Sequence, residues 1–247
     1  MISIIEKPNL PKGEVRHIIL GEKYKEMLEK PLISRGVIPI WLSDNPNVDA
    51  RLSGHADLSA VHIKDNEIAI VKGDCIAKEL TSIGFRVKTV DIKQSSIYPE
   101  DAALNFCIVG EYCICNKKTS STELIATLPY KVIECTQGYT KCSVLVVDDN
   151  SIITSDRIIA ENAKTAGLDV LLIDDCFVTL EGFKKGFIGG AAFKISKDEI
   201  AFTGCINDRV SKKLIERFLE KHSIHCSYLT DMDLFDIGSA IPLTEQI

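Results

Sequence analysis

One supersecondary pattern, repeated along the chain, limits the folds open to this sequence more than any other feature. Each copy predicts an apolar strand, a short polar turn, a second apolar strand, a capped amphipathic helix and a third strand. In the clearest copy, we expect strands over 58–63, 67–71 and 86–92, and Gly73-Asp74 opens a helix that Gly84 ends.

Three further copies begin at Leu104, Ser143 and Ala192, and a fifth at the N-terminus lacks its first strand. The elements expected in these copies are strands over 15–20, 37–41, 104–109, 113–115, 131–135, 143–147, 151–154, 170–173, 192–195, 199–202 and 225–229, and helices over 22–28, 121–128, 156–166 and 208–221. Either the C-terminal segment 239–243 or the N-terminal segment 2–5 could supply the missing strand. Units of about 47 residues then account for nearly the whole chain.

A single unit cannot cover its own sheet, so the copies must pack against one another. We expect residues 1–247 to form one α/β domain, a five-bladed propeller with strand-strand-helix-strand blades, strands inside and helices outside. Pairing of the C-terminal strand with the N-terminal half-unit would close the ring and remove open sheet edges. The alternatives are an open α+β sheet or two stacked domains.

Composition narrows the possible partners. A net charge of −6 argues against a general nucleic-acid or acidic-membrane binder, because both need a basic surface. We expect no membrane span, because no apolar run approaches about 18 residues, and no signal peptide, because the first apolar run stops at Glu6. Nine cysteines without an export signal or a Cys-x-x-Cys pair indicate free thiols in a reducing, cytoplasmic setting.

The segment that links one unit to the first strand of the next is called a joint. In a closed ring the joints point into the centre or lie around its opening, so we expect the functional residues there. The joint before residue 58 holds Asn45, Arg51, His55 and Asp57. His55 and Asp57 are two residues apart, so on an extended segment they project to one side. An imidazole can act as a general base and a carboxylate can bind a cationic substrate. A capped turn is the simpler interpretation.

The joint before residue 143 holds Tyr139, Lys141 and Cys142. A lysine beside a thiol could lower the pKa of that thiol and supply a nucleophilic thiolate. The alternative is a buried structural cysteine. Among the cysteines, Cys142 is the best candidate nucleophile, because most of the others fall in expected strands.

The last two joints contain Gly189-Gly190 and Asp236. The glycines allow either close approach to a ligand or tight packing at the ring centre, and Asp236 is expected near the same axis. His222, His225 and Cys226 are residue types that bind metals, but no fourth ligand is near them in sequence, so we expect no metal there. The basic side chains of helix 208–221 are expected on a solvated outer face.

The repeats and the His55-x-Asp57 pair resemble the guanidino-group-modifying enzymes, or penteins, which are pseudo-fivefold α/β propellers. Segments 186–190 and 141–143 are similar to those of bacterial proteins with this fold. The resemblance implies that a cysteine thiolate attacks a guanidinium carbon, that His55 moves protons, and that Asp57 anchors the guanidinium. It implies a small cationic guanidino or amidino substrate, no metal and no organic cofactor. The candidate substrate-binding residues are Asn45, Arg51, Tyr139, Lys141, Gly189, Gly190 and Asp236. A homodimer is compatible with the sequence.

Two departures from the pentein pattern leave two functions open. The family nucleophile usually lies in the last loop, yet segment 231–247 has no cysteine, and the Gly-Gly-acid motif is reduced to Gly189-Gly190-Ala191. We expect Cys142 to replace the nucleophile from another unit, in a hydrolase or an amidinotransferase. The alternative is a non-catalytic binding propeller, like translation initiation factor 6, with a filled centre.

Overall fold

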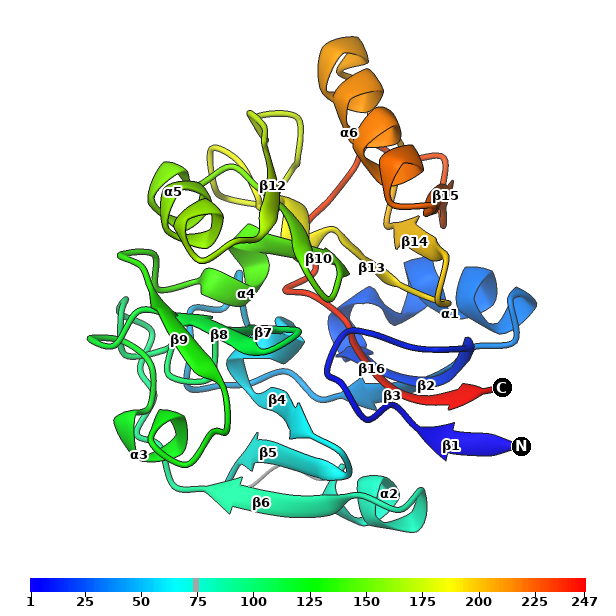
Figure 1. The fold of residues 1–247 in the computed structure, drawn as a ribbon. Helices are drawn as coiled ribbons and strands as arrows, with labels where there is room; N and C mark the ends of the chain where they lie inside the picture. The colour runs from blue at the N-terminus through cyan, green and yellow to red at the C-terminus, as the bar shows by residue number, and fades with distance from the viewer. Residues whose placement is uncertain (73–75) are drawn as a thin grey trace.

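Five small β-sheets surround the centre of the molecule and helices lie around them (Figure 1). The computed structural model describes residues 1–72 and 76–247. In four sheets the first strand pairs antiparallel with the second, and the second pairs parallel with the third. These sheets contain β4 (Ala60–Lys64), β5 (Glu67–Val71), β6 (Arg86–Val90); β7 (Cys107–Val109), β8 (Tyr112–Cys115), β9 (Lys131–Glu134); β10 (Val144–Asp148), β11 (Ser151–Thr154), β12 (Asp169–Leu172); and β13 (Ala192–Lys194), β14 (Glu199–Phe202), β15 (His225–Tyr228).

The remaining sheet is built from both ends of the chain. Its order is β1 (Ile2–Ile4), β16 (Ile241–Gln246), β2 (Glu14–Gly21) and β3 (Ile38–Leu42). The C-terminal strand β16 takes the place of the missing first strand, antiparallel to β2, and β1 pairs with the free edge of β16. The two termini therefore lie side by side (Figure 1).

A crossover helix joins the second and third strands of each sheet, because parallel neighbours cannot be joined by a tight turn. These helices are α1 (Lys25–Ser34, after the 3-10 turn η1, Glu22–Tyr24), α2 (Ala77–Ser82), α3 (Thr122–Ile125), α5 (Arg157–Thr165) and α6 (Arg209–Lys221). The caps explain the limits: Asp156 and Asp208 accept hydrogen bonds from backbone N–H groups of α5 and α6, at 2.9 and 2.7 Å. Gly84, with φ of +100°, ends α2, and the expected start of that helix at Gly73-Asp74 lies outside the described residues.

Apolar clusters between neighbouring sheets close the ring. One cluster joins the β4 and β7 sheets, the next joins the β7 and β10 sheets, and a third joins the β10 and β13 sheets. A fourth joins the β13 sheet to the sheet of β2, and a fifth joins that sheet to the β4 sheet. Each blade thus buries apolar side chains against both neighbours, as in a five-bladed propeller. No helix in the described ranges is both long and apolar enough to cross a bilayer.

Three joints contain a single helical turn that the sequence pattern did not predict. The turns are η2 (Ala56–Leu58), α4 (Thr140–Ser143) and η3 (Ile188–Gly190). The expectation of an extended His55-x-Asp57 segment was therefore wrong, because His55 is extended but Asp57 lies in the turn. The turns redirect the chain into the inner strands, and the joints touch one another: the amide of Asp57 donates to the carbonyl of Gly238 at 3.1 Å.

Truncation of a β16 side chain should weaken closure of the ring. Leu243 is fully buried, so Leu243→Ala is expected to lower the free energy of unfolding by about 3 kcal/mol. Ile2 in β1 is 54% exposed, and Ile2→Ala should cost less than about 0.5 kcal/mol. Denaturant unfolding measures both variants. Equal losses would show that β16 does not contribute to the core as described.

Candidate active site

Cys142 lies on the turn α4, directly before the inner strand β10. Its thiol donates a hydrogen bond to Oδ2 of Asp57 at 2.8 Å, and Nδ2 of Asn105 approaches the sulfur at 3.5 Å. Oδ1 of Asn105 accepts from the amides of Lys141 at 2.7 Å and Cys142 at 3.3 Å. Asn105 therefore fixes the turn that presents the sulfur. All three side chains are buried.

His55 completes a cluster with the sulfur and the carboxylate. A ring nitrogen of His55, Sγ of Cys142 and a carboxylate oxygen of Asp57 all lie within 4.8 Å of one another. His55 is only 3% exposed, and its Nε2 has no hydrogen-bond partner. The structure thus brings together the three residues proposed from the sequence as nucleophile, acid/base and anchor.

A second carboxylate enters the centre from the joint before β16. Oδ2 of Asp236 accepts from the amide of Phe187 at 2.9 Å, and Oδ1 accepts from the amide of Gly238 at 2.8 Å. A Cβ atom on Gly190 would lie 1.9 Å from Oδ1 of Asp236. The glycine is therefore required for the carboxylate to fit. Asp236 supplies a carboxylate beside the glycine pair, which lacks its own acidic neighbour at Ala191.

A cavity of about 320 Å³ opens onto these groups. Its lining combines the polar or charged side chains of His55, Tyr139, Cys142, Lys184, Lys185 and Asp236 with the apolar side chains of Leu52, Leu180, Phe183 and Phe187. Four of the five joints contribute to this lining, which places the cavity at the convergence of the blades. The binding-propeller alternative expected a filled centre, and the structure has a cavity there instead.

Burial sets the protonation of the cluster. Loss of water contact raises the pKa of Asp57 to about 6 and that of Asp236 to about 7, and it lowers the pKa of His55 to about 3. Burial, followed by the charges of Asp57 and Asp236, raises the pKa of Cys142 well above 9. At neutral pH the free site therefore holds a neutral imidazole and a protonated thiol.

The expectation that Lys141 lowers the pKa of Cys142 was wrong. Desolvation and two carboxylates act on the sulfur in the opposite direction. Lys141 is buried, but it lines a separate cavity of about 20 Å³ that it shares with Asp57. Its charge acts on the carboxyl of Asp57, whose pKa it lowers against the larger effect of burial.

Comparison with known proteins fixes the family and the fold. A family model described as a family of unknown function (DUF6873) matches residues 19–241. The chain belongs to this family. The matched range includes every residue of the cluster. No curated protein sequence matches the chain.

Solved structures similar to this family member are pentein enzymes. An amidinotransferase from Microseira wollei in the saxitoxin biosynthetic pathway is 9% identical, with a TM-score of 0.57 over 90% of this chain and 91% of that chain. A cysteine-to-serine variant of C. jejuni agmatine deiminase with substrate bound is 12% identical, with a TM-score of 0.57 over 98% and 96%. Dimethylarginine dimethylaminohydrolase from Pseudomonas aeruginosa is 10% identical, with a TM-score of 0.52 over 95% and 100%. The chain has the pentein fold.

Other residues selected from the sequence of this DUF6873 family member fall in different places. Tyr139 lines the cavity and its hydroxyl donates to Asp101 at 2.6 Å. Asn45 lies outside the cavity lining, and its Nδ2 donates to Ser59 and Gln94 at 2.9 and 2.8 Å. The structure therefore gives Asn45 a role in holding the joint.

Arg51 joins two loops near the rim of the cavity. Its guanidinium pairs with Asp49 at 2.6 Å, donates to the carbonyl of Gly182 at 3.0 Å, and lies 4.2 Å from the ring centre of Phe183. Gly189 is buried, and a Cβ atom there would lie 2.3 Å from the carbonyl oxygen of Val144. Gly189 therefore allows close packing against the backbone of Val144.

Asn105 was missed by sequence reasoning, although a signal for it exists. In four of the five joints, one residue two or three positions before the inner strand lies at the centre: Asp57 before β4, Asn105 before β7, Cys142 before β10 and Gly190 before β13. Aligning the repeats on their inner strands would have selected Asn105.

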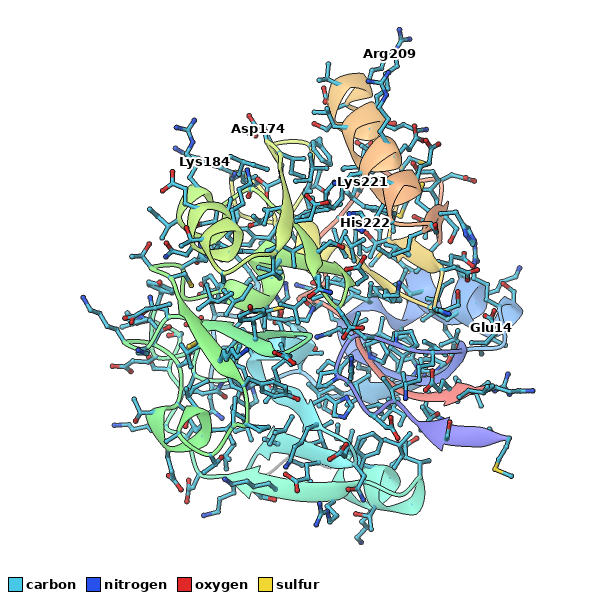
Figure 2. The ribbon with its side chains drawn as sticks, viewed as in Figure 1. Glu14, Asp174, Lys184, Arg209, Lys221 and His222 are labelled. Carbon is cyan, nitrogen blue, oxygen red and sulfur yellow. The ribbon has the colours of Figure 1, made fainter. Side chains whose placement is uncertain are left out.

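The His222 region is an ion cluster between blades. The ring of His222 contacts Asp148 through Nδ1 at 2.7 Å and Asp169 through Nε2 at 2.9 Å. Figure 2 shows His222 and Lys221 at the inner end of α6 and Arg209 at its outer end. His225 is exposed and pairs with Glu199 at 3.5 Å. Both ring nitrogens of His222 are thus already occupied. The basic face of α6 is exposed, as predicted.

The buried Asp236 should make stability depend on pH. Its pKa is about 7 in the folded chain against an ordinary value of 3.8, so its protonated form is favoured by folding. The stability that Asp236 contributes to the folded state through this raised pKa is fully present below pH 4 and is lost as pH rises towards 7. We expect the unfolding free energy of wild type minus that of Asp236→Asn to fall by up to about 1.4 kcal/mol per pH unit in this window.

The unfolding free energies of wild type and Asp236→Asn are compared, because burial of His55 changes stability with pH in the opposite direction in both proteins. Its folded pKa of about 3 lies below the ordinary 6.5, so its contribution is present above pH 6.5 and is lost as pH falls. Urea unfolding of both proteins at several pH values measures the difference. A difference independent of pH between 4 and 7 would contradict a raised pKa at Asp236.

Proposed function

We propose that this protein is an enzyme that modifies a small guanidino or amidino compound through the sulfur of Cys142. The observation that carries this proposal is the cluster of Cys142, His55 and Asp57, whose functional atoms lie within 4.8 Å of one another beside a central cavity. The support from comparison is that similar folds include an amidinotransferase, a deiminase and a dimethylaminohydrolase.

The two buried carboxyl groups of the site favour a cationic head group. These groups belong to Asp57 and Asp236, and within residues 1–72 and 76–247 neither forms an ion pair. Lys184 and Lys185 also line the cavity, and Lys185 is paired with Asp175 at 2.5 Å. A guanidinium presents several N–H donors in one plane, so it can satisfy both carboxylates at once. Its charge would also oppose the effect of the carboxylates on the sulfur, so that the thiol ionises when substrate is bound.

The first chemical step needs a proton acceptor next to the thiol. The carboxylate of Asp57 is already hydrogen-bonded to that thiol at 2.8 Å. In our proposal the S–H proton passes to Asp57 and the sulfur electron pair forms a bond to the guanidinium carbon. The carbon–nitrogen bond of the leaving group then breaks, and the departing nitrogen takes the proton held by Asp57 and leaves as ammonia or an amine.

The second step releases the carbon from sulfur. A water molecule, or the amine of an acceptor, adds to the amidino carbon, and the carbon–sulfur bond breaks to restore the Cys142 sulfur. His55 is neutral and its Nε2 is free of hydrogen bonds, so it can take the proton from the attacking water or amine. Addition of water makes the enzyme a hydrolase, and addition of an amine makes it an amidinotransferase.

A substrate panel tests the proposal. Guanidino and amidino compounds with cationic, neutral and anionic tails are incubated with the protein, with and without added primary amines. We expect release of ammonia or an amine from at least one compound, and a new guanidino product where an added amine is the acceptor. The proposal would be contradicted if no compound released ammonia or an amine and if none of the compounds protected Cys142 from alkylation.

We also propose that residues 1–247 act as one domain in a reducing compartment such as the cytoplasm. All cysteines in residues 1–72 and 76–247 are free thiols, as expected there. A homodimer stays a prediction.

A further inference from the structure

We propose that the site has a second kind of ligand, a divalent transition-metal ion of the Zn²⁺ type, held by Cys142, His55 and Asp57. The ion would take the place of the thiol proton and exclude the guanidino substrate. The inference uses the same residues as the proposed function, but it does not require that the protein turn over any compound.

The donor set fits such an ion. Sulfur, imidazole nitrogen and carboxylate oxygen are its usual protein ligands, with bonds of about 2.0–2.3 Å in a tetrahedral arrangement. Donors around one tetrahedral ion lie about 3.5 Å apart. The three donors here already lie within 4.8 Å of one another, so small side-chain movements complete the geometry.

Orphaned polar atoms give independent support. Nε2 of His55 and Oδ1 of Asp57 are buried and have no hydrogen-bond partner, which is unfavourable in a dry interior. His55 also lines the central cavity, so its ring can be reached from that side. A metal ion would satisfy lone pairs that the protein alone leaves unused.

Charge balance also favours the ion. Binding converts the Cys142 thiol and M²⁺ into a metal thiolate and a released proton. The thiolate and the Asp57 carboxylate together neutralise the double charge, so the buried complex is formally neutral. Three protein ligands leave a fourth position for water, directed to the cavity. The sulfur electron pair that would attack a substrate is then used in the metal bond.

Titration with Co²⁺ tests the inference, because Co²⁺ reports sulfur ligation by a charge-transfer absorption band. We expect one Co²⁺ per chain with this band, competition by Zn²⁺, and protection of Cys142 from alkylation that a chelator reverses. Cys142→Ser should remove the band while keeping the side-chain size. His55→Ala and Asp57→Asn should each weaken binding at least about 10- to 100-fold.

A matched control separates this site from surface thiols. Cys176 is exposed and lies outside the cluster, so Cys176→Ser should bind Co²⁺ as wild type does. Absence of the band in wild type, or a band that persists in Cys142→Ser, would overturn the inference. A Cys142-dependent band in a protein that turns over no guanidino compound would uphold the inference and remove the proposed function. Turnover of a guanidino compound by a protein that shows no band would overturn the inference and leave the proposed function in place.

Discussion

A Cys142→Ser variant is expected to lose at least about 10³-fold in turnover of whichever guanidino compound the protein accepts. The serine hydroxyl fits the space of the thiol and can still hydrogen-bond to Asp57, so folding should be preserved. A hydroxyl is a far weaker nucleophile, and the buried site offers it no stronger base than that carboxylate. Steady-state rates of both proteins, with matched thermal unfolding curves, measure the effect.

Cys135→Ser is the matched control for this variant. Cys135 is also buried, and its sulfur lies 3.5 Å from the hydroxyl of Thr140, but it does not line the central cavity. Its rate should remain within a few-fold of wild type. If both variants retain wild-type rates, Cys142 is not the nucleophile. If both lose activity equally, the loss reports packing and not chemistry.

Gly190→Ala is expected to destabilise the protein by about 4 kcal/mol and to disorganise the site. The added Cβ would lie 1.9 Å from Oδ1 of Asp236, so the carboxylate must move. Movement would break its hydrogen bonds to Phe187 and Gly238 and leave buried polar groups unpaired. Chemical denaturation measures the loss, and activity should fall with it.

Two comparisons isolate this steric cause. In an Asp236→Ala background the oxygen that Gly190→Ala meets is absent, so the substitution should cost much less there, a coupling that a double-mutant cycle reports. Gly167→Ala tests backbone conformation alone, since Gly167 has φ of +98° and a Cβ there meets nothing within 4 Å. It should cost about 1 kcal/mol. Equal costs of Gly190→Ala in both backgrounds would contradict the packing described.

The blades could be predicted because their signals are local. Strands β5, β11 and β14 have the limits expected from alternation, and the helices expected over 156–166 and 208–221 are present, with Asp156 and Asp208 as their N-caps. The choice between the two termini for the missing strand could not be made locally. It depends on pairing across the whole chain, and β16 takes the inner position while β1 takes the edge.

The chemistry of the site was harder to predict than its members. Placing Cys142, His55 and Asp57 at the ring centre followed from the repeat order. The protonation of Cys142 did not, because it depends on burial and on carboxylates from two distant joints rather than on the neighbouring Lys141. The role of Gly190 was also hidden, because Asp236, which needs the space, is 46 residues away in sequence.

Covalent trapping on Cys142 tests the central claim most directly. The protein, with His55→Ala to slow release, is mixed with each reactive guanidino compound, quenched in acid, digested and mapped by mass spectrometry. We predict an amidino adduct on the peptide that contains Cys142, absent from Cys142→Ser and formed while other thiols stay unmodified. Product formation without any adduct on Cys142, or an adduct confined to other cysteines, would contradict the account.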